Sequence, residues 1–227
     1  MTVLELFAGT RSIGKAFEAA GHKVLSVDWD KQFEDIDLYA DIGKLTKEDI
    51  IELCGGIPDV VWMSPDCTSY SIAAIRYHRK KNEETEELEP VSDYAKFCDE
   101  VNKHIIDVIT NEIKPKVFFI ENPRGGMRKM SFVKELPRYT VTYCQYGDTR
   151  QKPTDIWTNH PNPKFKPMCK PGAPCHQAAP RGSRTGTQGL RNHVERSRIP
   201  EQLCQHIVTI CEEVVEGEGH AADSIKS

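Results

Sequence analysis

A cysteine in a polar setting is the first residue of this chain whose type and position suggest chemistry. Cys67 lies in the stretch Ser64-Pro65-Asp66-Cys67-Thr68, directly after an apolar run that ends at Met63. A thiolate is a strong nucleophile, and proline, carboxyl and hydroxyl neighbours are not typical of a buried structural cysteine. A nucleophilic thiol needs its pKa lowered by nearby cations or by a helix N-terminus, and a helix expected to begin near Thr68 could serve. The sequence therefore favours a catalytic role for Cys67.

A glycine-containing turn near the N-terminus indicates a cofactor site. The stretch from Phe7 to Gly14 (FAGTRSIG) joins a predicted strand to a predicted helix, but it is not the GxGxxG of dinucleotide sites. Asp28 ends the next strand, where its carboxylate can accept both ribose hydroxyls, and Trp29 can stack on an adenine. These features fit S-adenosylmethionine. The residues expected to line the cofactor site are Phe7, Gly9, Thr10, Ser12, Ile13, Asp28, Trp29, Asp41, Ile42, Ser64 and Pro65.

Alternating β-branched runs and amphipathic stretches predict how these residues are positioned. The predicted strands are Val3–Phe7, Lys23–Val27, Asp59–Met63, Val117–Ile120 and Tyr139–Tyr143, and the predicted helices are Ser12–Ala20, Thr46–Cys54, Ser92–Ile113 and one starting at Pro200. This order predicts an α/β fold with a mostly parallel sheet and helices on both faces. Ligands of such sheets bind at the carboxyl ends of the strands. Glu121 follows the fourth strand, so we expect it to meet Cys67 and the glycine turn there as a proton donor.

Composition limits the class of protein. The 227 residues carry a net charge of −4, and 38% of them are hydrophobic, as in an ordinary globular protein. The sequence shows neither an export signal nor a run of about 18 apolar residues, so we expect a cytosolic protein whose eight cysteines are reduced. The basic runs 76–81 and 181–198 would confine any contact with a polyanion to one face.

Three motifs together resemble those of the DNA cytosine-5 methyltransferases. LELFAGTRSIGKAF resembles the first motif of the family, SPDC stands where the family has its Pro-Cys nucleophile, and ENPRG is similar to its Glu-Asn-Val motif. The match extends from Thr2 to about Thr158, and the chain is similar to short, solitary methyltransferases of phages and prophages. The resemblance implies a Rossmann-like S-adenosylmethionine-dependent methyltransferase fold. It also implies a phage or restriction–modification setting in the cytoplasm of a bacterial host.

The resemblance further implies a covalent mechanism on DNA. Cys67 would add to carbon 6 of a cytosine, Glu121 would protonate ring nitrogen 3, and carbon 5 would then take the methyl group. In duplex DNA the cytosine must first be flipped out of the stack. The Gln-x-Arg-x-Arg motif of the family is matched loosely by residues 146–154, where Arg150 or Lys152 would hold the base or its phosphate.

The region available for target recognition is short. The family usually has a whole recognition domain before its closing helix, whereas this chain offers only a Pro-, Gly- and Arg-rich stretch there. We therefore predict a catalytic domain at 1–158, a loop-rich insertion at 159–198, and a closing helix with its tail at 199–227. Specificity would be short, relaxed, absent or supplied by a partner. The residues expected to contact nucleic acid are Arg124, Arg181, Arg184, Thr187 and Gln188.

A group of sulfur and imidazole donors in this insertion suggests a structural zinc ion. His160, Cys169, Cys175 and His176 offer the four ligands that zinc prefers, and a segment with few apolar residues gains most from a metal. Cys144 is a substitute ligand. The alternative is a set of ordinary thiols and surface histidines.

Two other functions stay open from the sequence alone. The same chemistry could act on structured RNA, because relatives with little recognition apparatus can methylate transfer RNA. A non-catalytic nucleic-acid-binding or partner-binding module could also keep this fold.

Overall fold

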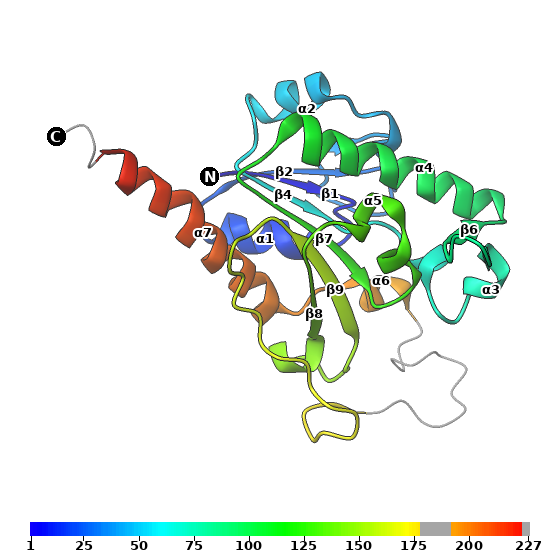
Figure 1. Ribbon diagram of the computed structural model, residues 1–227. Helices are drawn as coiled ribbons and strands as arrows, with labels where there is room; N and C mark the ends of the chain where they lie inside the picture. The colour runs from blue at the N-terminus through cyan, green and yellow to red at the C-terminus, as the bar shows by residue number, and fades with distance from the viewer. Residues whose placement is uncertain (178–191, 224–227) are drawn as a thin grey trace.

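A seven-stranded sheet forms the centre of the computed structural model, which describes residues 1–177 and 192–223 (Figure 1). The strand order is β3-β2-β1-β4-β7-β9-β8, and four of the six pairings are parallel. Among these strands only β9 points in the opposite direction to the others, so its pairings with β7 and β8 are antiparallel. The predicted α/β fold with a mostly parallel sheet is confirmed. The strands are β1 Thr2–Leu6, β2 Lys23–Asp28, β3 Leu38–Tyr39, β4 Val60–Met63, β7 Val117–Pro123, β8 Arg138–Thr142 and β9 Pro153–Thr158.

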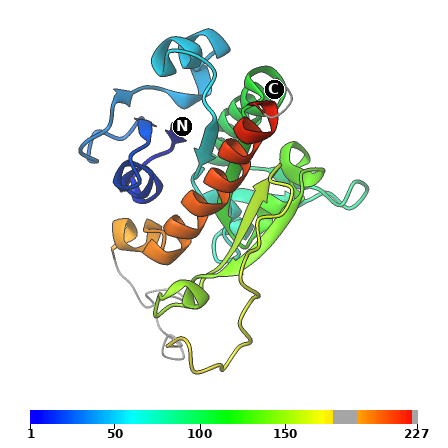
Figure 2. The same ribbon diagram turned by 90° about the vertical axis from the view of Figure 1, so that its left-hand side faces the viewer.

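Helices cover both faces of the sheet (Figures 1 and 2). On one face, α2 (Lys47–Cys54), α4 (Asp93–Asp107), its π-helical continuation η3 (Val108–Ile113) and α5 (Ser131–Lys134) share a core with alternate strand residues. On the other face, α1 (Ser12–Ala19) and α7 (Glu201–Asp223) pack together around a second core. Because α7 packs on this second core, it covers the same sheet that β1 begins. Within residues 1–177 and 192–223, no helix is both long and apolar enough to cross a membrane.

Two helices begin at the capping residues that the sequence predicts. Thr46 caps α2, since its Oγ1 accepts from Asp49 N at 3.2 Å and Asp49 accepts from Thr46 N at 2.8 Å. Ser92 caps α4 by accepting from Ala95 N at 3.1 Å.

The structure adds elements that the sequence did not predict, namely β3 and β9, the turns η1 Ile42–Lys44, η4 Gly126–Lys129 and η5 Tyr143–Tyr146, the hairpin β5 Arg79–Lys81 with β6 Leu88–Pro90, and the short helices α3 Ile75–His78 and α6 His193–Ser197.

The prediction that a helix begins near Thr68 is wrong. Only a three-residue 3-10 turn, η2 (Thr68–Tyr70), follows Cys67, and Ser71 is already extended. The Asp66 carboxylate accepts from Thr68 N at 2.7 Å, which satisfies the local donor without an α-helix. Since the macrodipole comes from a run of aligned peptide units, this turn gives Cys67 little help as an anion.

A buried arginine fixes the segment that follows Cys67 to the rest of the domain. The Arg79 side chain is fully buried, and its guanidinium donates to Ser69 O at 2.9 Å and to Asp99 at 2.6 and 2.9 Å. Tyr70 lies under the same guanidinium at 4.2 Å and donates to Asp99 at 2.7 Å. The hairpin therefore anchors η2 against α4. Arg79 belongs to the basic run 76–81, so this run is not wholly a surface for polyanions.

Replacing Arg79 with methionine should destabilise the protein, because it leaves the Asp99 carboxylate without its cation and Ser69 without two hydrogen bonds. The loss of one partner of such a pair costs about 3–5 kcal/mol of the free energy of unfolding. Urea denaturation followed by circular dichroism measures it. Lys81→Met in the same hairpin is the control, because the Lys81–Glu86 pair is exposed and should leave stability nearly unchanged. Equal midpoints for the two variants would contradict this assignment.

Candidate active site

The glycine turn after β1 is built from left-handed backbone and tied to β2. Phe7, Gly9 and Arg11 have φ values of 56°, 49° and 54°. Gly9 N donates to Asp28 Oδ2 at 2.8 Å, and Asp30 N donates to Asp28 Oδ1 at 2.9 Å. Burial raises the pKa of the Asp28 carboxyl above its usual value, against these hydrogen bonds. The turn and the acidic residue predicted for one ligand therefore lie side by side.

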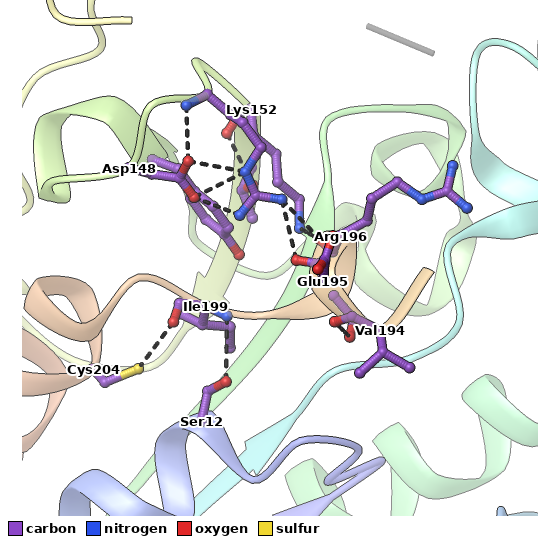
Figure 3. Close-up of polar contacts among 12 residues, drawn as sticks. Ser12, Asp148, Lys152, Val194, Glu195, Arg196, Ile199 and Cys204 are labelled. Carbon is purple, nitrogen blue, oxygen red and sulfur yellow. Dashed lines mark hydrogen bonds and ion pairs between the residues drawn. The ribbon is translucent and has the colours of Figure 1, made fainter. Parts of the chain in front are cut away.

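A cavity of about 790 Å³ opens beside this turn. Gly9, Thr10 and Ser12 line one side of it, and Val194 and Arg198 from the α6 region line another. Ile199 N donates to Ser12 Oγ at 3.3 Å, so the segment before α7 lies against the turn (Figure 3). The Trp29 side chain is 68% exposed, which leaves its ring free to stack on a ligand. Other residues that line the cavity are Lys15, Ala16, Phe33, Glu201, Cys204 and Gln205.

Three residues predicted for the cofactor site have other contacts in the structure. Ile13 and Ile42 are buried in the two cores, so their side chains serve packing. The Asp41 carboxylate accepts from Gly43 N at 3.1 Å and pairs with Lys44 at 3.2 Å. Asp41 caps its own turn, η1, which explains an acidic residue there without a ligand.

The sequence analysis overlooked a buried carboxyl group behind the turn. Glu5 is 2% exposed, and burial raises its pKa to about 7. A Cβ atom on Gly14 would lie 2.4 Å from Glu5 Oε2, so a larger residue at this position would displace the carboxyl. Arg11 lies in the same interior and donates to Ser26 Oγ at 2.7 Å. An acidic residue within the apolar run VLEL was the signal that could have found Glu5.

Cys67 and Glu121 meet where β4 and β7 end. Asn122 Nδ2 donates to Pro65 O at 2.9 Å and joins the two strand ends. Tyr143 OH donates to Glu121 Oε1 at 3.1 Å, and the Ser64 hydroxyl also bonds this carboxyl. The predicted meeting of Cys67 and Glu121 on one sheet edge agrees with this arrangement. Tyr143, which the sequence placed only at the end of a strand, is an additional member of the site.

One buried cation faces both groups. Lys152 is 7% exposed, and its charge lowers the pKa values of Glu121 and Cys67. Burial outweighs it in both cases, so the pKa of Glu121 is raised and that of the Cys67 thiol is raised to about 11, with Asp66 as a further cause. Burial likewise lowers the pKa of Lys152. The sequence analysis expected a lowered pKa for the Cys67 thiol, and this expectation is wrong for the protein without substrate.

The two predicted cations have different environments. Lys152 Nζ donates to Arg196 O in α6 at 2.8 Å (Figure 3). It also lies 4.6 Å from the centre of the Tyr143 ring. Arg150 Nε donates to Asp148 at 2.9 and 3.0 Å, and its Nη1 donates to Glu195 O at 3.4 Å. Of the two, Lys152 is the cation that acts on Cys67 and Glu121.

The residues predicted to contact nucleic acid are only partly described. Arg124 is exposed directly after β7, and its backbone N donates to Pro153 O at 2.9 Å. The other four predicted residues lie outside the described part of the chain, namely Arg181, Arg184, Thr187 and Gln188.

Four sulfur and nitrogen donors gather at the end of β8. The ligand atoms of Cys144, Cys169, Cys175 and His176 all lie within 4.8 Å of one another. His160, which the sequence included in place of Cys144, lies elsewhere. Its Nε2 is 3.0 Å from Ile210 O, and its Nδ1 accepts from Asn162 N at 3.1 Å.

Comparison with known proteins agrees with this site. The family profile described as C-5 cytosine-specific DNA methylase matches residues 1–138. A probable DNA (cytosine-5)-methyltransferase of Frog virus 3 (isolate Goorha) is 30% identical over 167 residues, which span 70% of this chain and 71% of the viral one. The structure of the Entamoeba histolytica methyltransferase EhMeth aligns with a TM-score of 0.51 at 16% identity, over 70% of this chain and 52% of that one, and so supports the fold. The chain belongs to the C-5 cytosine-specific DNA methylases.

Proposed function

We propose that this protein transfers a methyl group from S-adenosylmethionine to carbon 5 of cytosine in duplex DNA, and that it also carries a structural zinc ion. The observation that carries the proposal is the grouping of Cys67, Glu121 and Lys152 at the carboxyl ends of β4 and β7. The family and the name of the viral relative support DNA as the substrate. The phage, restriction–modification and cytoplasmic settings expected from the sequence stay predictions.

Cys67 and Glu121 divide the work on the ring. The Cys67 sulfur forms a bond to carbon 6, and the electron pair of the 5,6 double bond moves into the ring toward nitrogen 3. Glu121 gives its proton to nitrogen 3, which neutralises the charge that develops there. Bound S-adenosylmethionine supplies the electrophilic methyl group that carbon 5 then takes. Solvent water then takes the proton from carbon 5, the bond between carbon 6 and sulfur breaks with its electron pair returning to the Cys67 thiolate, and the 5,6 double bond forms again. Nitrogen 3 returns its proton to Glu121, which restores the starting carboxyl group.

The pKa values explain how the reactive state arises. The mechanism needs Cys67 deprotonated and Glu121 protonated, so the pair holds one proton in total. In the free protein burial raises the pKa of both groups, that of Cys67 to about 11, so neither the thiol nor the carboxyl gives up a proton readily. Moving a proton from sulfur to Glu121 changes no net charge beside Lys152. We infer that the flipped base, which hydrogen-bonds a protonated Glu121, favours this rearrangement.

The chain's own residues fit the proposed cofactor. Asp28 keeps lone pairs for ribose hydroxyls after accepting from Gly9 and Asp30, Trp29 exposes a ring for adenine, and the cavity beside Gly9 and Thr10 leaves room for the rest. The fit rests on these residues, while Asp41 stays an untested part of the prediction.

Asp28→Ala should weaken S-adenosylmethionine binding about 10- to 100-fold, because hydrogen bonds to a charged acceptor contribute roughly 1.5–3 kcal/mol. Calorimetric titration of the protein with S-adenosylmethionine measures the dissociation constant. Asp41→Ala is the matched comparison, and we expect a smaller effect since that carboxylate is held in η1. Unchanged affinity in Asp28→Ala would remove Asp28 from the site.

Cys67→Ser should abolish a covalent complex with DNA. Fluorine at carbon 5 cannot leave as a proton does, so a 5-fluorocytosine duplex should trap the wild-type protein in a denaturation-resistant adduct when S-adenosylmethionine is present. Cys98→Ser is the control, because Cys98 is a buried thiol in a core. A fluorocytosine-containing RNA hairpin run in parallel separates the two substrates. Trapping on RNA but not DNA would favour the RNA alternative, and trapping by Cys67→Ser would contradict the mechanism.

The rate of methyl transfer should show a bell-shaped dependence on pH. Below the raised pKa of Glu121 both groups hold protons and no thiolate exists, so the rate falls as pH decreases. Above about 11 both groups are deprotonated and the ring loses its proton donor, so the rate falls again. Single-turnover transfer to duplex DNA measures this profile. Glu121→Gln should lower the rate about 10²- to 10⁴-fold, and its rate should keep rising with pH through the Cys67 titration, because no carboxyl group is left to lose a proton. An alkaline fall that survives in this variant would assign that limb to another group.

A further inference from the structure

We infer that Cys144, Cys169, Cys175 and His176 bind one zinc ion, and that this ion fixes the residue 143–152 turn beside Glu121. The ligand set differs from the one expected from sequence, because Cys144 replaces His160. The second half of the inference rests on the proposed methylation for its catalytic readout, whereas the metal site does not.

Three distances between the four donors match a tetrahedral zinc site, and a fourth is shorter than such a site requires. Zinc–sulfur bonds of about 2.3 Å and zinc–nitrogen bonds of about 2.0 Å place sulfur atoms about 3.8 Å apart and sulfur about 3.5 Å from nitrogen. Cys144 Sγ lies 3.1 Å from Cys169 Sγ and 3.6 Å from Cys175 Sγ. His176 Nδ1 lies 3.6 Å from Cys169 Sγ and 3.7 Å from Cys175 Sγ. Four protein ligands leave no open position, so the ion would be structural.

Amide groups around the cluster suit thiolate ligands. Gln151 Nε2 lies 3.3 Å from Cys169 Sγ, and Gln145 Nε2 lies 3.6 Å from Cys175 Sγ, with both amides placed to donate. Such donors orient and stabilise sulfur ligands of a bound metal. Cys169 is also held through its backbone, since its N donates to Thr142 Oγ1 at 3.0 Å.

The segment that supplies three of these ligands has little packing of its own, so a bound metal would stabilise it. Residues 159–177 contain neither helix nor strand, and Phe165 is one of few side chains from this stretch that pack on a core. A metal can replace the apolar packing that a loop of this kind lacks.

The cluster is joined directly to the catalytic groups. Cys144 follows Tyr143, whose hydroxyl donates to Glu121, and Gln151 precedes Lys152. Tyr143 N donates to Gln151 O at 2.9 Å, and Gln177 N donates to Thr149 O at 2.8 Å. The ion would thus hold both ends of the 143–152 turn to residues 169–177, and with them the two side chains that set the charge around Glu121.

Metal analysis of protein purified with a reductant and without added metal tests the site. Wild type should contain close to one zinc per chain, and Cys175→Ser and His176→Gln should lose most of it. His160→Gln is the matched control and should keep the ion even if it unfolds at a lower temperature. Cys175→His should also keep it, because imidazole can replace a thiolate. Cobalt bound in place of zinc should show thiolate-to-metal charge-transfer absorption that weakens in Cys175→Ser.

Loss of zinc should lower the thermal midpoint by roughly 5–10 °C and slow trapping of the fluorocytosine duplex about 10- to 100-fold, since misplaced catalytic groups cost such factors. Zinc near zero in wild type purified in this way would overturn the site. Full trapping rate in zinc-free Cys175→Ser would overturn the positioning role alone. Wild type that holds zinc but traps neither DNA nor RNA would refute the methylation and leave the metal site supported.

Discussion

The active site depends on one buried cation, Lys152, which lies next to two groups whose pKa values are raised by burial. An ammonium group away from water is costly unless it is paired. Here Glu121 and Cys67 face it, Arg196 O accepts from it, and the Tyr143 ring lies beside it. Its backbone has a φ of 27°, a conformation that non-glycine residues adopt rarely and mostly at functional sites. Several separate elements, β4, β7, β9 and α6, are needed to hold this single charge in place.

The parts of the site that follow buried strands could be predicted from the sequence. Cys67, Glu121 and Asp28 each follow an apolar run, and parallel strands bring such residues to one edge. The sequence did not indicate β9, because PTDIWT begins with proline and contains aspartate, which are both rare in strands. It also could not give the thiol pKa. Desolvation of Cys67 depends on what the folded chain packs around it, and that outweighs the local motif.

The revised metal cluster shows a related limit. Along the chain, His160 is as close to Cys169 as many zinc ligands are to each other. In the folded protein, however, the His160 ring contacts α7, where its Nε2 lies 3.0 Å from Ile210 O. Cys144 is 25 residues from Cys169, but β8 ends there, and the two sulfur atoms lie 3.1 Å apart. Arg79 is a second example of this limit. Its charge suggested an exposed position, whereas it is buried and pairs with Asp99 in α4. Pairings between distant segments are set by tertiary structure, which residue types alone do not encode.

The segments on either side of residues 178–191 contact the turn that carries Lys152 and the cofactor turn. Before residue 178, Gln177 N bonds Thr149 O in the turn that carries Lys152. After residue 191, α6 accepts hydrogen bonds from Lys152 and Arg150, and Ile199 bonds Ser12 at the cofactor turn. Both ends of residues 178–191 therefore join the described structure next to the catalytic cation. A change in either flanking segment therefore acts on the residues that set the charge at Glu121, because the backbone of both segments is hydrogen-bonded to the turn that carries Lys152.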